Sequence, residues 1–472
     1  MVLTTGAAAE QRLICGRGFS ELCTWAATIP LAAVPAHVLR RACLVLADDI
    51  AAIVAAAMEP EVAAVQEELT RNAGPPAATV LARTPVRVDR HNAAAANGMA
   101  ICWTELDEGY RLVACHAGAY IIPALLAEAE ASGALTRDLL ASLAVAYEVT
   151  ARIAHAFPCE PLRVHPHGAF APLGAAAGVA RLRGYGAKDF AAALSSAMTM
   201  SHAGPYGHAP AGALARNAWT ATGAWSGYRA ADWARLGIGG LAETVFDVMV
   251  TCYGHACVPD RLNTGLGTSW AISSGYHKMV ACCQYAHSAV EATLGLRAQN
   301  PALADPVNIA GIVVATHPMG ETLATREPET VLAGKFSMLH AVATAAVHGS
   351  AGASAFARGS LTDPVVAGLR RRIRLLPYED IKPWPKDRPA RVDVSFTDGR
   401  RISANVDSAR GGPDDPFSEH ELRAKIAALT ADLYPAMAPR LARLETSTSA
   451  WVDDLAAMLA QSAPNDKRAG AT

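Results

Sequence analysis

The chain has 472 residues, of which 51% are hydrophobic and 18% charged, so it can bury the cores of two or three domains. Its 41 basic and 43 acidic residues are evenly mixed and give a net charge of −2, which leaves no basic face for nucleic acid. No apolar run reaches the roughly 20 residues of a membrane helix, and the N-terminal residues lack a signal-peptide pattern. We therefore expect a soluble, cytoplasmic protein with neither a nucleic-acid partner nor a membrane partner.

The ten cysteines lie mostly inside apolar helical patterns and share no regular spacing, which favours reduced core thiols over disulfides. Cys252, His255 and Cys257 resemble metal ligands, but no fourth ligand follows at a zinc-site spacing. The glycine cluster at Gly237–Gly240 lacks the preceding strand of a dinucleotide-binding loop. The sequence thus predicts no metal and no cofactor.

The first half of the chain is Ala-rich and predicts helices. Residues 1–20 carry a weak pattern and read as a loose arm, and Phe19 to Met58 reads as helical with a turn at Pro30 and Pro35. Residues 78–88 have short β character, and further helices are predicted at 92–108, 119–132, 138–156, 169–183, 187–201 and 214–236. Asp48 and Asp49 are expected to be a partly exposed or capped pair rather than a catalytic dyad, because adjacent helical residues diverge by about 100°.

The pattern changes after about Gly265. Residues 307–316 are β-branched, and residues 391–406 alternate on either side of Asp398-Gly399, which predicts a hairpin. Helices predicted at 274–298, 335–348 and 364–375 interleave with these strands, and a capping box at Ser418–Glu421 starts further helices at 418–433 and 451–461. The tail after Ser462 reads as disordered.

These elements predict a mainly α fold in which a large all-helical domain, built from N- and C-terminal segments, carries a smaller inserted α+β domain. The expected boundaries are 20–268 for the first helical segment, 269–410 for the α+β domain and 411–462 for C-terminal helices that rejoin the helical domain.

A dense group of ionisable residues lies at Glu105 to His116, where three carboxylates and a histidine fall within twelve residues. Asp107 and His116 are nine positions apart and would face opposite sides of one unbroken helix. A break at Gly109, which accepts positive φ, can bring them together. His116 would then start the next helix, where free N–H groups suit a bound carboxylate.

A second stretch repeats this design, because His165-Pro-His167-Gly opens a helix that Gly184 closes. Two helix starts introduced by histidine suggest a pocket for a small anion with more than one acidic group. Lys278 and Arg216 are cations in otherwise apolar surroundings. Together these groups can supply the base, the acid and the charge needed to remove a proton next to a carboxylate.

Several phrases of the chain resemble the MmgE/PrpD family, which includes 2-methylcitrate dehydratase, cis-aconitate decarboxylase and iminodisuccinate epimerase. They are Asn97-Gly-Met-Ala100, Glu105-Leu-Asp-Glu-Gly109, His165-Pro-His-Gly168, Lys278 with Cys282-Cys-Gln-Tyr-Ala-His287, and Lys335-Phe-Ser337. The resemblance runs from about Trp25 to Leu429. It implies that an active site is lined by Asp107, His116, His165 and Lys278, which we assign as catalytic, and we assign Glu105, Tyr110, His167, Arg216 and His287 to substrate binding.

The chain departs from the family pattern at several positions. Glu105-Leu-Asp107-Glu-Gly stands where many members have Asp-Phe-Asp-Asp-Thr, so either Glu105 or Asp107 can take the place of the functional carboxylate. Arg216 stands where lysine is common and cannot shuttle protons. Gln284 replaces a frequent arginine, and His116-Ala replaces His-Pro.

The leading hypothesis is a cofactor-independent lyase that dehydrates or decarboxylates a small di- or tricarboxylic acid between the two domains. An epimerase of a small dicarboxylate and a non-catalytic scaffold with the same fold are the alternatives. The Ala-rich helices between Ala169 and Ser201 carry few charges, and both this feature and the resemblance predict a homodimer through the helical domain. The sequence does not select one substrate.

Overall fold

The computed structural model describes residues 6–460, and helices dominate it. The helices span Gly6–Thr28 (α1), Ala36–Ala56 (α2), Pro60–Arg71 (α3), Arg90–Ile101 (α4), Ala117–Ser132 (α5), Thr136–Ala156 (α6), Pro166–Leu182 (α7), Ala187–Thr199 (α8), Ala215–Ala234 (α9), Thr244–Phe246 (α10), His287–Gln299 (α11), Pro318–Glu321 (α12), Val331–Lys335 (α13), Met338–His348 (α14), Arg358–Thr362 (α15), Pro364–Arg370 (α16), Glu419–Thr430 (α17), Met437–Leu441 (α18) and Trp451–Leu459 (α19). The strands span Ala78–Val80 (β1), Val86–Val88 (β2), Gly109–Tyr110 (β3), Gly275–Tyr276 (β4), Ile309–Thr316 (β5), Ile373–Pro377 (β6), Ala390–Phe396 (β7) and Arg401–Val406 (β8).

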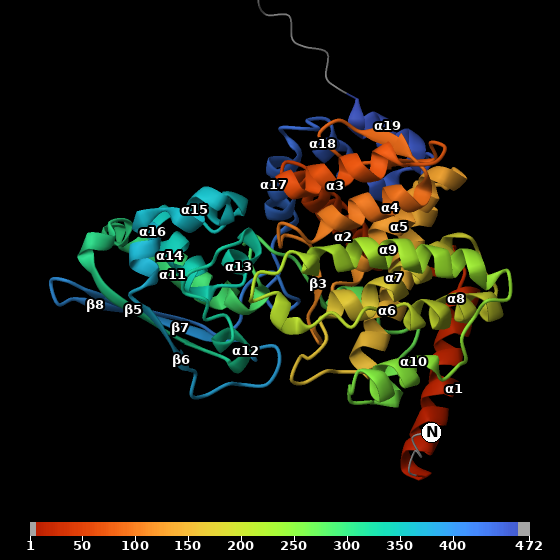
Figure 1. The fold of residues 1–472 in the computed structure, drawn as a ribbon, viewed down its shortest axis with the longest axis horizontal. Coiled ribbons are helices and arrows are strands. Elements are labelled where there is room, and N and C mark those ends of the chain that lie inside the picture. Colours follow the sequence, from red (N-terminus) through yellow and green to blue (C-terminus); the bar gives the residue numbers. More distant parts are fainter. Residues whose placement is uncertain (1–5, 461–472) are drawn as a thin grey trace, which may run out of the picture.

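The elements form two lobes (Figure 1). The larger lobe is helical and contains α1 to α9, with α17, α18 and α19 from the end of the chain beside them. The smaller lobe contains β5 to β8 and the helices from α11 to α16. The predicted fold class, mainly α with a smaller α+β part, is confirmed.

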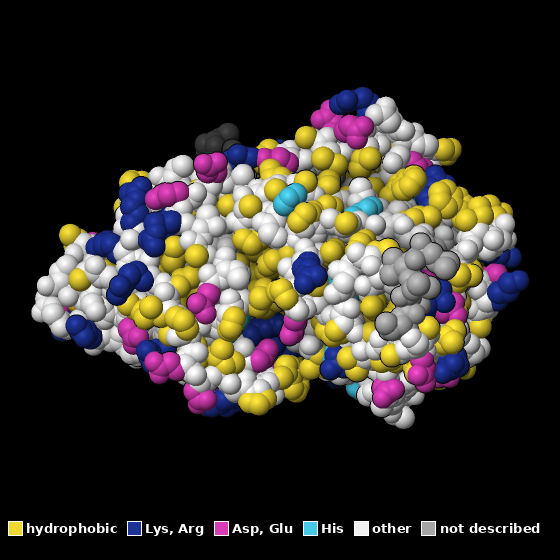
Figure 2. All heavy atoms as spheres, turned by 60° about the horizontal axis from the view of Figure 1, so that its bottom comes forward, with side chains coloured by type: hydrophobic (Ala, Val, Ile, Leu, Met, Phe, Trp, Pro, Cys, Tyr) yellow, Lys and Arg dark blue, Asp and Glu magenta, His cyan; other side chains and the backbone are white. Residues whose placement is uncertain are grey.

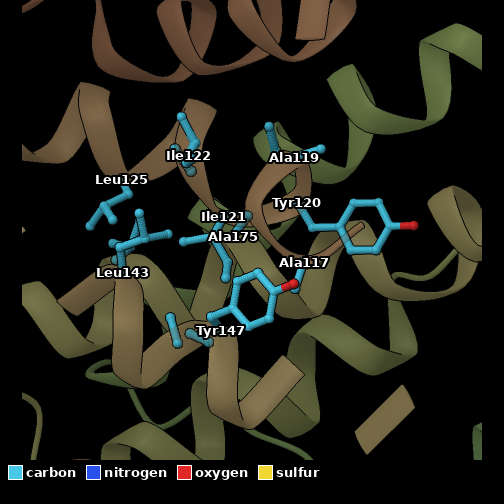
Figure 3. Packing of buried hydrophobic residues seen from close by; sticks show 14 of the residues in the cluster. Ala117, Ala119, Tyr120, Ile121, Ile122, Leu125, Leu143, Tyr147 and Ala175 are labelled. Carbon is cyan, nitrogen blue, oxygen red and sulfur yellow. The ribbon is translucent and has the colours of Figure 1, made fainter. Parts of the chain in front are cut away.

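Helices α5 and α7 form the centre of the larger lobe, and α7 also packs against α6, α8 and α9. Figure 3 shows Ile121 and Leu125 of α5 among Leu143 of α6 and Ala175 of α7. Small residues allow this close approach, since a Cβ added at Gly227 of α9 would lie 2.7 Å from the Cβ of Ala175. The Ala-rich composition thus sets how tightly the bundle packs.

The smaller lobe is a mixed sheet covered by helices. Its strand order is β6-β5-β7-β8, with β5 and β6 parallel and the other pairs antiparallel. Val392 and Val394 of β7 are buried, and α11 and α14 pack on the sheet. The predicted hairpin is confirmed, with Gly399 at φ +88° in its turn.

The C-terminal helices pack on the larger lobe, α17 against α2 and α19 against α5 and α6. The predicted capping box is present: Ser418 Oγ accepts the Glu421 N–H, and the Glu421 carboxylate accepts the Ser418 N–H. The expected disordered tail after Ser462 lies outside the described residues.

The expectation of a loose arm at residues 1–20 is wrong for the described part, because α1 begins at Gly6. Cys15, Phe19, Leu22 and Cys23 recur at helical spacing, and their burial against the rest of the bundle stabilises the helix. Tertiary packing therefore outweighs the weak local pattern.

Three predicted helices are too long. The helix expected at 92–108 ends at Ile101, the one at 274–298 begins only at His287, and the one at 364–375 ends at Arg370, before β6. The misassigned residues of the first helix form turns, whereas those of the other two include strands that pair with distant segments, β4 with β3 and β6 with β5. Such long-range pairing has no signature in local periodicity.

We predict that Gly227→Ala lowers the free energy of unfolding of the larger lobe by about 1–3 kcal/mol, because the added methyl overpacks the contact with α7. Denaturant unfolding followed by circular dichroism measures this change. Gly295→Ala on α11 is the matched control, since a Cβ there meets no atom of residues 6–460 within 4 Å, and it should stabilise by up to about 1 kcal/mol. Equal effects of the two substitutions would contradict the packing argument.

Candidate active site

A cavity of about 50 Å³ lies between the two lobes. The larger lobe contributes side chains that include Glu105, Tyr110, His116, His165 and Arg216, all of them predicted from the sequence. Lys278, also predicted, comes from the connection between the lobes, and Phe336 and Arg388 come from the smaller lobe. The cavity therefore exists only when both lobes are in place.

Asp107 and His116 form a hydrogen-bonded pair beside the cavity. His116 Nδ1 lies 2.6 Å from Asp107 Oδ2 and 2.9 Å from the carbonyl oxygen of Glu108. Both partners are acceptors, so Nδ1 must carry a proton. In the neutral ring Nε2 then holds the lone pair, on the edge away from Asp107, and the ring lines the cavity.

Asp107 is completely buried and also lies 3.3 Å from Lys278 Nζ. Burial alone would raise the pKa of Asp107, but the charge of Lys278 and the hydrogen bond with His116 outweigh it and hold that pKa far below its usual range. Burial would likewise lower the pKa of Lys278, but Asp107 and Glu105 raise it above its usual value. The two side chains thus form a buried ion pair at neutral pH.

The turn that brings these groups together differs from the one expected. Gly109 lies in β3, where a Cβ would collide with the ring of Tyr276, and its φ is not positive. Glu105 instead takes the left-handed conformation, with φ 55°, alone among the non-glycine residues from 6 to 460. This conformation costs about 1–2 kcal/mol, and the ion pairs of Glu105 with Arg216, at 2.6 Å, and with Lys278, at 3.7 Å, offset it.

Asp48 and Asp49 are both fully buried, so the expectation of a partly exposed pair is wrong. Asp48 lies 2.7 Å from Nδ1 of His277 and 2.6 Å from Nζ of Lys425, while Asp49 Oδ1 accepts the Glu108 N–H at 2.9 Å. The two carboxylates point apart on α2, as adjacent helical residues must. Asp48 thus holds His277, which precedes Lys278, and Asp49 holds the backbone of Glu108, which follows Asp107.

His165 caps α7 as predicted, and its Nδ1 accepts the His167 N–H at 3.2 Å. His165 Nε2 lies 3.3 Å from Nε of Arg216. Burial and the charge of Arg216 lower the pKa of both His165 and His167 well below its usual value, so both rings are neutral. His167 lies behind the cavity wall, with Nδ1 2.9 Å from the Tyr120 hydroxyl and its ring against those of His116 and His165.

The helix termini are less available than the sequence suggested. His116 does cap α5, but Glu108 Oε1 already accepts the Gly118 N–H at 2.7 Å. A protein carboxylate thus occupies the place expected for a substrate carboxylate. Arg216 is similarly committed, since it contacts His165, Asn217 and Glu105.

Sequence reasoning missed Arg388, Tyr206, Tyr276 and Tyr285, which also line the cavity. Arg388 stacks on Tyr285, 4.8 Å from the ring centroid, and donates to Oε1 of Gln284. A guanidinium therefore lies beside the position where Gln284 replaces a frequent arginine. A lone arginine ahead of a strand carries no sequence signal, so this contact could not be anticipated.

His287, assigned to substrate binding, lies outside the cavity lining. Its Nε2 lies 3.0 Å from the carbonyl oxygen of Cys282, and burial lowers the pKa of His287 to about 3. This contact holds the turn before α11. Among the described residues no group of three or more His, Cys, Asp and Glu side chains could hold a metal ion, and none of the helices there combines the length and hydrophobicity needed to cross a bilayer.

The profile of the MmgE/PrpD N-terminal domain matches residues 20–257, and that of the MmgE/PrpD C-terminal domain matches residues 280–448. The chain belongs to the MmgE/PrpD family. It is 26% identical to the cis-aconitate decarboxylase-like protein oryM of Aspergillus oryzae, over 94% of this chain and 97% of that protein. It is 24% identical to the cis-aconitate decarboxylase of Aspergillus terreus, over 83% of this chain and 85% of that protein. The family models and these relatives support a lyase-type family.

The carboxyl groups of Asp49 and Glu108 lie together behind the site and lead to a prediction about how stability depends on pH. A Cβ on Gly118 would lie 2.6 Å from Asp49 Oδ2 and 2.9 Å from Glu108 Oε1, so the two oxygens face the same small space. Burial raises the pKa of Glu108 from 4.5 to about 7. A carboxyl whose pKa is higher in the folded protein than in the unfolded chain stabilises the fold fully at pH values below its pKa in the unfolded chain. This contribution to the free energy of unfolding is lost as the pH rises to the pKa in the folded protein.

We therefore expect Glu108→Gln to become more stable relative to the wild type as the pH rises from about 5 to 7, because the wild type loses the contribution of Glu108 over this range. Thermal unfolding midpoints measured across that range test the expectation. Glu419→Gln, an exposed residue on α17, is the control and should leave the dependence on pH unchanged. A Glu108→Gln profile parallel to that of the wild type would contradict the raised pKa.

Proposed function

We propose that the protein is a cofactor-independent lyase that acts on a small di- or tricarboxylic acid by proton transfer at a carbon next to a carboxylate. The observation that carries the proposal is the Asp107–His116 pair, which leaves Nε2 of a cavity-lining imidazole as a base. The family membership and the decarboxylase names of the relatives support the same reaction type.

In the proposed reaction His116 Nε2 takes the proton, and the electrons of the broken C–H bond pass into the adjacent carboxylate as an enediolate. Asp107 orients His116 and stabilises the imidazolium that forms. Lys278 keeps its proton, because its pKa is raised, and acts as a fixed positive charge. The enediolate then expels a hydroxyl group from the neighbouring carbon, and this group leaves as water with the proton held by the His116 imidazolium. Decarboxylation would instead start from the protonated ring: CO₂ leaves, and the electron pair of the broken C–CO₂ bond takes the His116 proton onto carbon.

The substrate carboxylates are proposed to bind Arg388 and Lys278. Arg216 lines the cavity, but most of its N–H groups face Glu105, His165 and Asn217. We therefore assign Arg216 to holding Glu105 and His165 in place, and Tyr110 to the cavity wall. Arg388 supplies at this point of the cavity the positive charge that Gln284 lacks.

An epimerase is the weaker alternative because it needs a second acid or base facing the same carbon. His165 is the candidate, but its Nδ1 accepts a backbone N–H and its Nε2 faces Arg216. Incubation with citrate-type acids in heavy water separates the two. An epimerase incorporates deuterium into recovered substrate, a dehydratase produces ultraviolet absorbance of a new double bond, and a scaffold does neither.

We predict that His116→Ala lowers turnover at least about a hundredfold, and that Asp107→Asn does so too by releasing the ring orientation. Steady-state turnover of an acid identified in a panel of small polycarboxylates measures both effects. His420→Ala, an exposed histidine on α17, is the matched control and should retain full activity. Full activity of both site variants would reject the assignment.

The homodimer remains a proposal, on a different surface from the one first expected. The apolar faces of α7 are covered within one chain by α5, α6, α8 and α9. Trp225, Leu236, Ile238 and Leu241 are instead exposed on α9 and the loop that follows it. Large apolar side chains clustered on a surface are typical of an interface between subunits.

We expect light scattering at micromolar concentration to give a mass near twice the 49.2 kDa of one chain. The double variant Ile238→Asp/Leu241→Asp should lower it toward one chain, because two carboxylates would be buried in the interface. Val307→Asp, an exposed apolar residue of the smaller lobe, is the control. A wild-type mass of one chain would exclude the dimer.

A further inference from the structure

Two cysteines that are far apart in the chain meet at one end of the larger lobe. Cys15 lies on α1, and Cys257 lies in an irregular segment that follows α10. Their sulfur atoms are 2.9 Å apart, although 242 positions separate the two residues. This distance exceeds the length of a disulfide bond by only about 0.9 Å. Both residues are free thiols in the structure, so the pair is close to bonding distance without being bonded.

Further contacts between α1 and the same part of the chain hold the two thiols together. Gln11 Nε2 donates to the carbonyl oxygen of Cys257 at 3.2 Å, and Arg12 forms an ion pair with Asp247 at 2.7 Å. Gln11 and Cys15 are four positions apart, so they share one face of the helix. One face of α1 therefore contacts both the backbone and the sulfur atom of Cys257.

The two thiols differ in exposure and in acidity. Cys15 is 2% exposed, whereas Cys257 is half-buried and follows the exposed Ala256. The hydrogen bond from Cys15 lowers the pKa of the Cys257 thiol, while this hydrogen bond and burial raise the pKa of Cys15. The thiolate is the nucleophile in thiol–disulfide exchange, so Cys257 is the thiol that reacts first.

The surface around this contact is open to small molecules. Helices α1 and α10 lie side by side at the bottom of the larger lobe in Figure 1. Figure 2 brings this end of the lobe forward, and side chains of both charges lie there among hydrophobic ones. Because the charges are mixed, a small anionic molecule can approach this surface.

We propose that Cys15 and Cys257 are a site of reversible oxidation, at which a low-molecular-weight disulfide such as oxidised glutathione converts the two thiols into one disulfide. The Cys257 thiolate attacks one sulfur of the oxidant, forms a mixed disulfide and releases one glutathione thiolate. Cys15 then loses its proton and attacks the Cys257 sulfur, which breaks the mixed disulfide and releases the second glutathione thiolate. The two thiol protons end on the released glutathione molecules, and the two electrons lost by the protein reduce the oxidant.

The disulfide would join α1 to the segment after α10 and so close a ring that contains α2 to α9. A crosslink across a long loop restricts the unfolded chain strongly, and the irregular segment around Cys257 can take up the small shift that bonding requires. Oxidation should therefore raise the thermal unfolding midpoint by about 4 °C or more, and a reductant should reverse the change. Neither cysteine lines the cavity between the lobes, so this oxidation does not depend on the proposed reaction.

The test starts from the reduced full-length protein, which is incubated with oxidised glutathione and digested without reductant. Mass spectrometry should detect a peptide pair joined through Cys15 and Cys257, and dithiothreitol should abolish it. Cys252 is exposed, and its glutathione adduct shows that the oxidant has reached the protein. A chain that carries this adduct but no Cys15–Cys257 crosslink, or a crosslink between Cys252 and Cys257, would overturn the proposal.

Variants test the order of the two steps. Cys15→Ser should stop the exchange at a glutathione adduct on Cys257 and abolish the rise in the unfolding midpoint. Cys257→Ser should leave Cys15 unmodified, because that thiol is buried. Cys23→Ser, at another buried cysteine of α1, is the matched control and should keep both the crosslink and the rise.

The midpoint of each reduced variant, compared with that of the reduced wild type, shows whether the variant is folded. A glutathione adduct on Cys15 in folded Cys257→Ser would contradict the proposed order of attack. An equal rise of the midpoint in oxidised wild type and oxidised Cys15→Ser would show that the crosslink does not stabilise the lobe, and would overturn that part of the proposal.

Discussion

The burial of Asp107 between Lys278 and His116 is the interaction on which the rest of the site depends. An isolated carboxylate in this position would cost many kcal/mol, so it persists only because a cation and a hydrogen-bond donor meet it there. Asp107 and these two partners come from three separate segments of the chain. The hydrogen bond between His116 and Asp107 stabilises the buried carboxylate, and it also fixes the tautomer of His116. One contact therefore affects both the stability of the site and the reactivity of the ring.

A layer of buried acidic groups behind the site keeps these three segments in register. Asp48 holds His277, next to Lys278, and Asp49 holds the backbone of Glu108, next to Asp107. Both lie on α2, so a single helix sets the spacing between cation and carboxylate. Because α17 also reaches this layer through Lys425, the C-terminal helices contribute to the site without lining it.

The contacts of Gln284 and Arg216 in the folded protein explain how the site accommodates these two departures from the family pattern. Gln284 lacks a charge that Arg388 supplies from another segment, and Arg216 binds Glu105 in its left-handed turn. Arg388 therefore lines the cavity while it donates to Gln284.

The sequence by itself determined the helical class, the hairpin at Asp398-Gly399, the capping box at Ser418 and the helix starts at His116 and His165, because each depends on periodicity or on contacts a few residues apart. It also identified most of the ionisable residues that line the cavity. Only the tertiary structure decided that Glu105 rather than Gly109 makes the turn, that Asp48 and Asp49 are buried, and that Arg388 enters the site while His287 stays out of it. These outcomes depend on contacts between residues far apart in the chain. The energies of such contacts cannot be read from local sequence patterns.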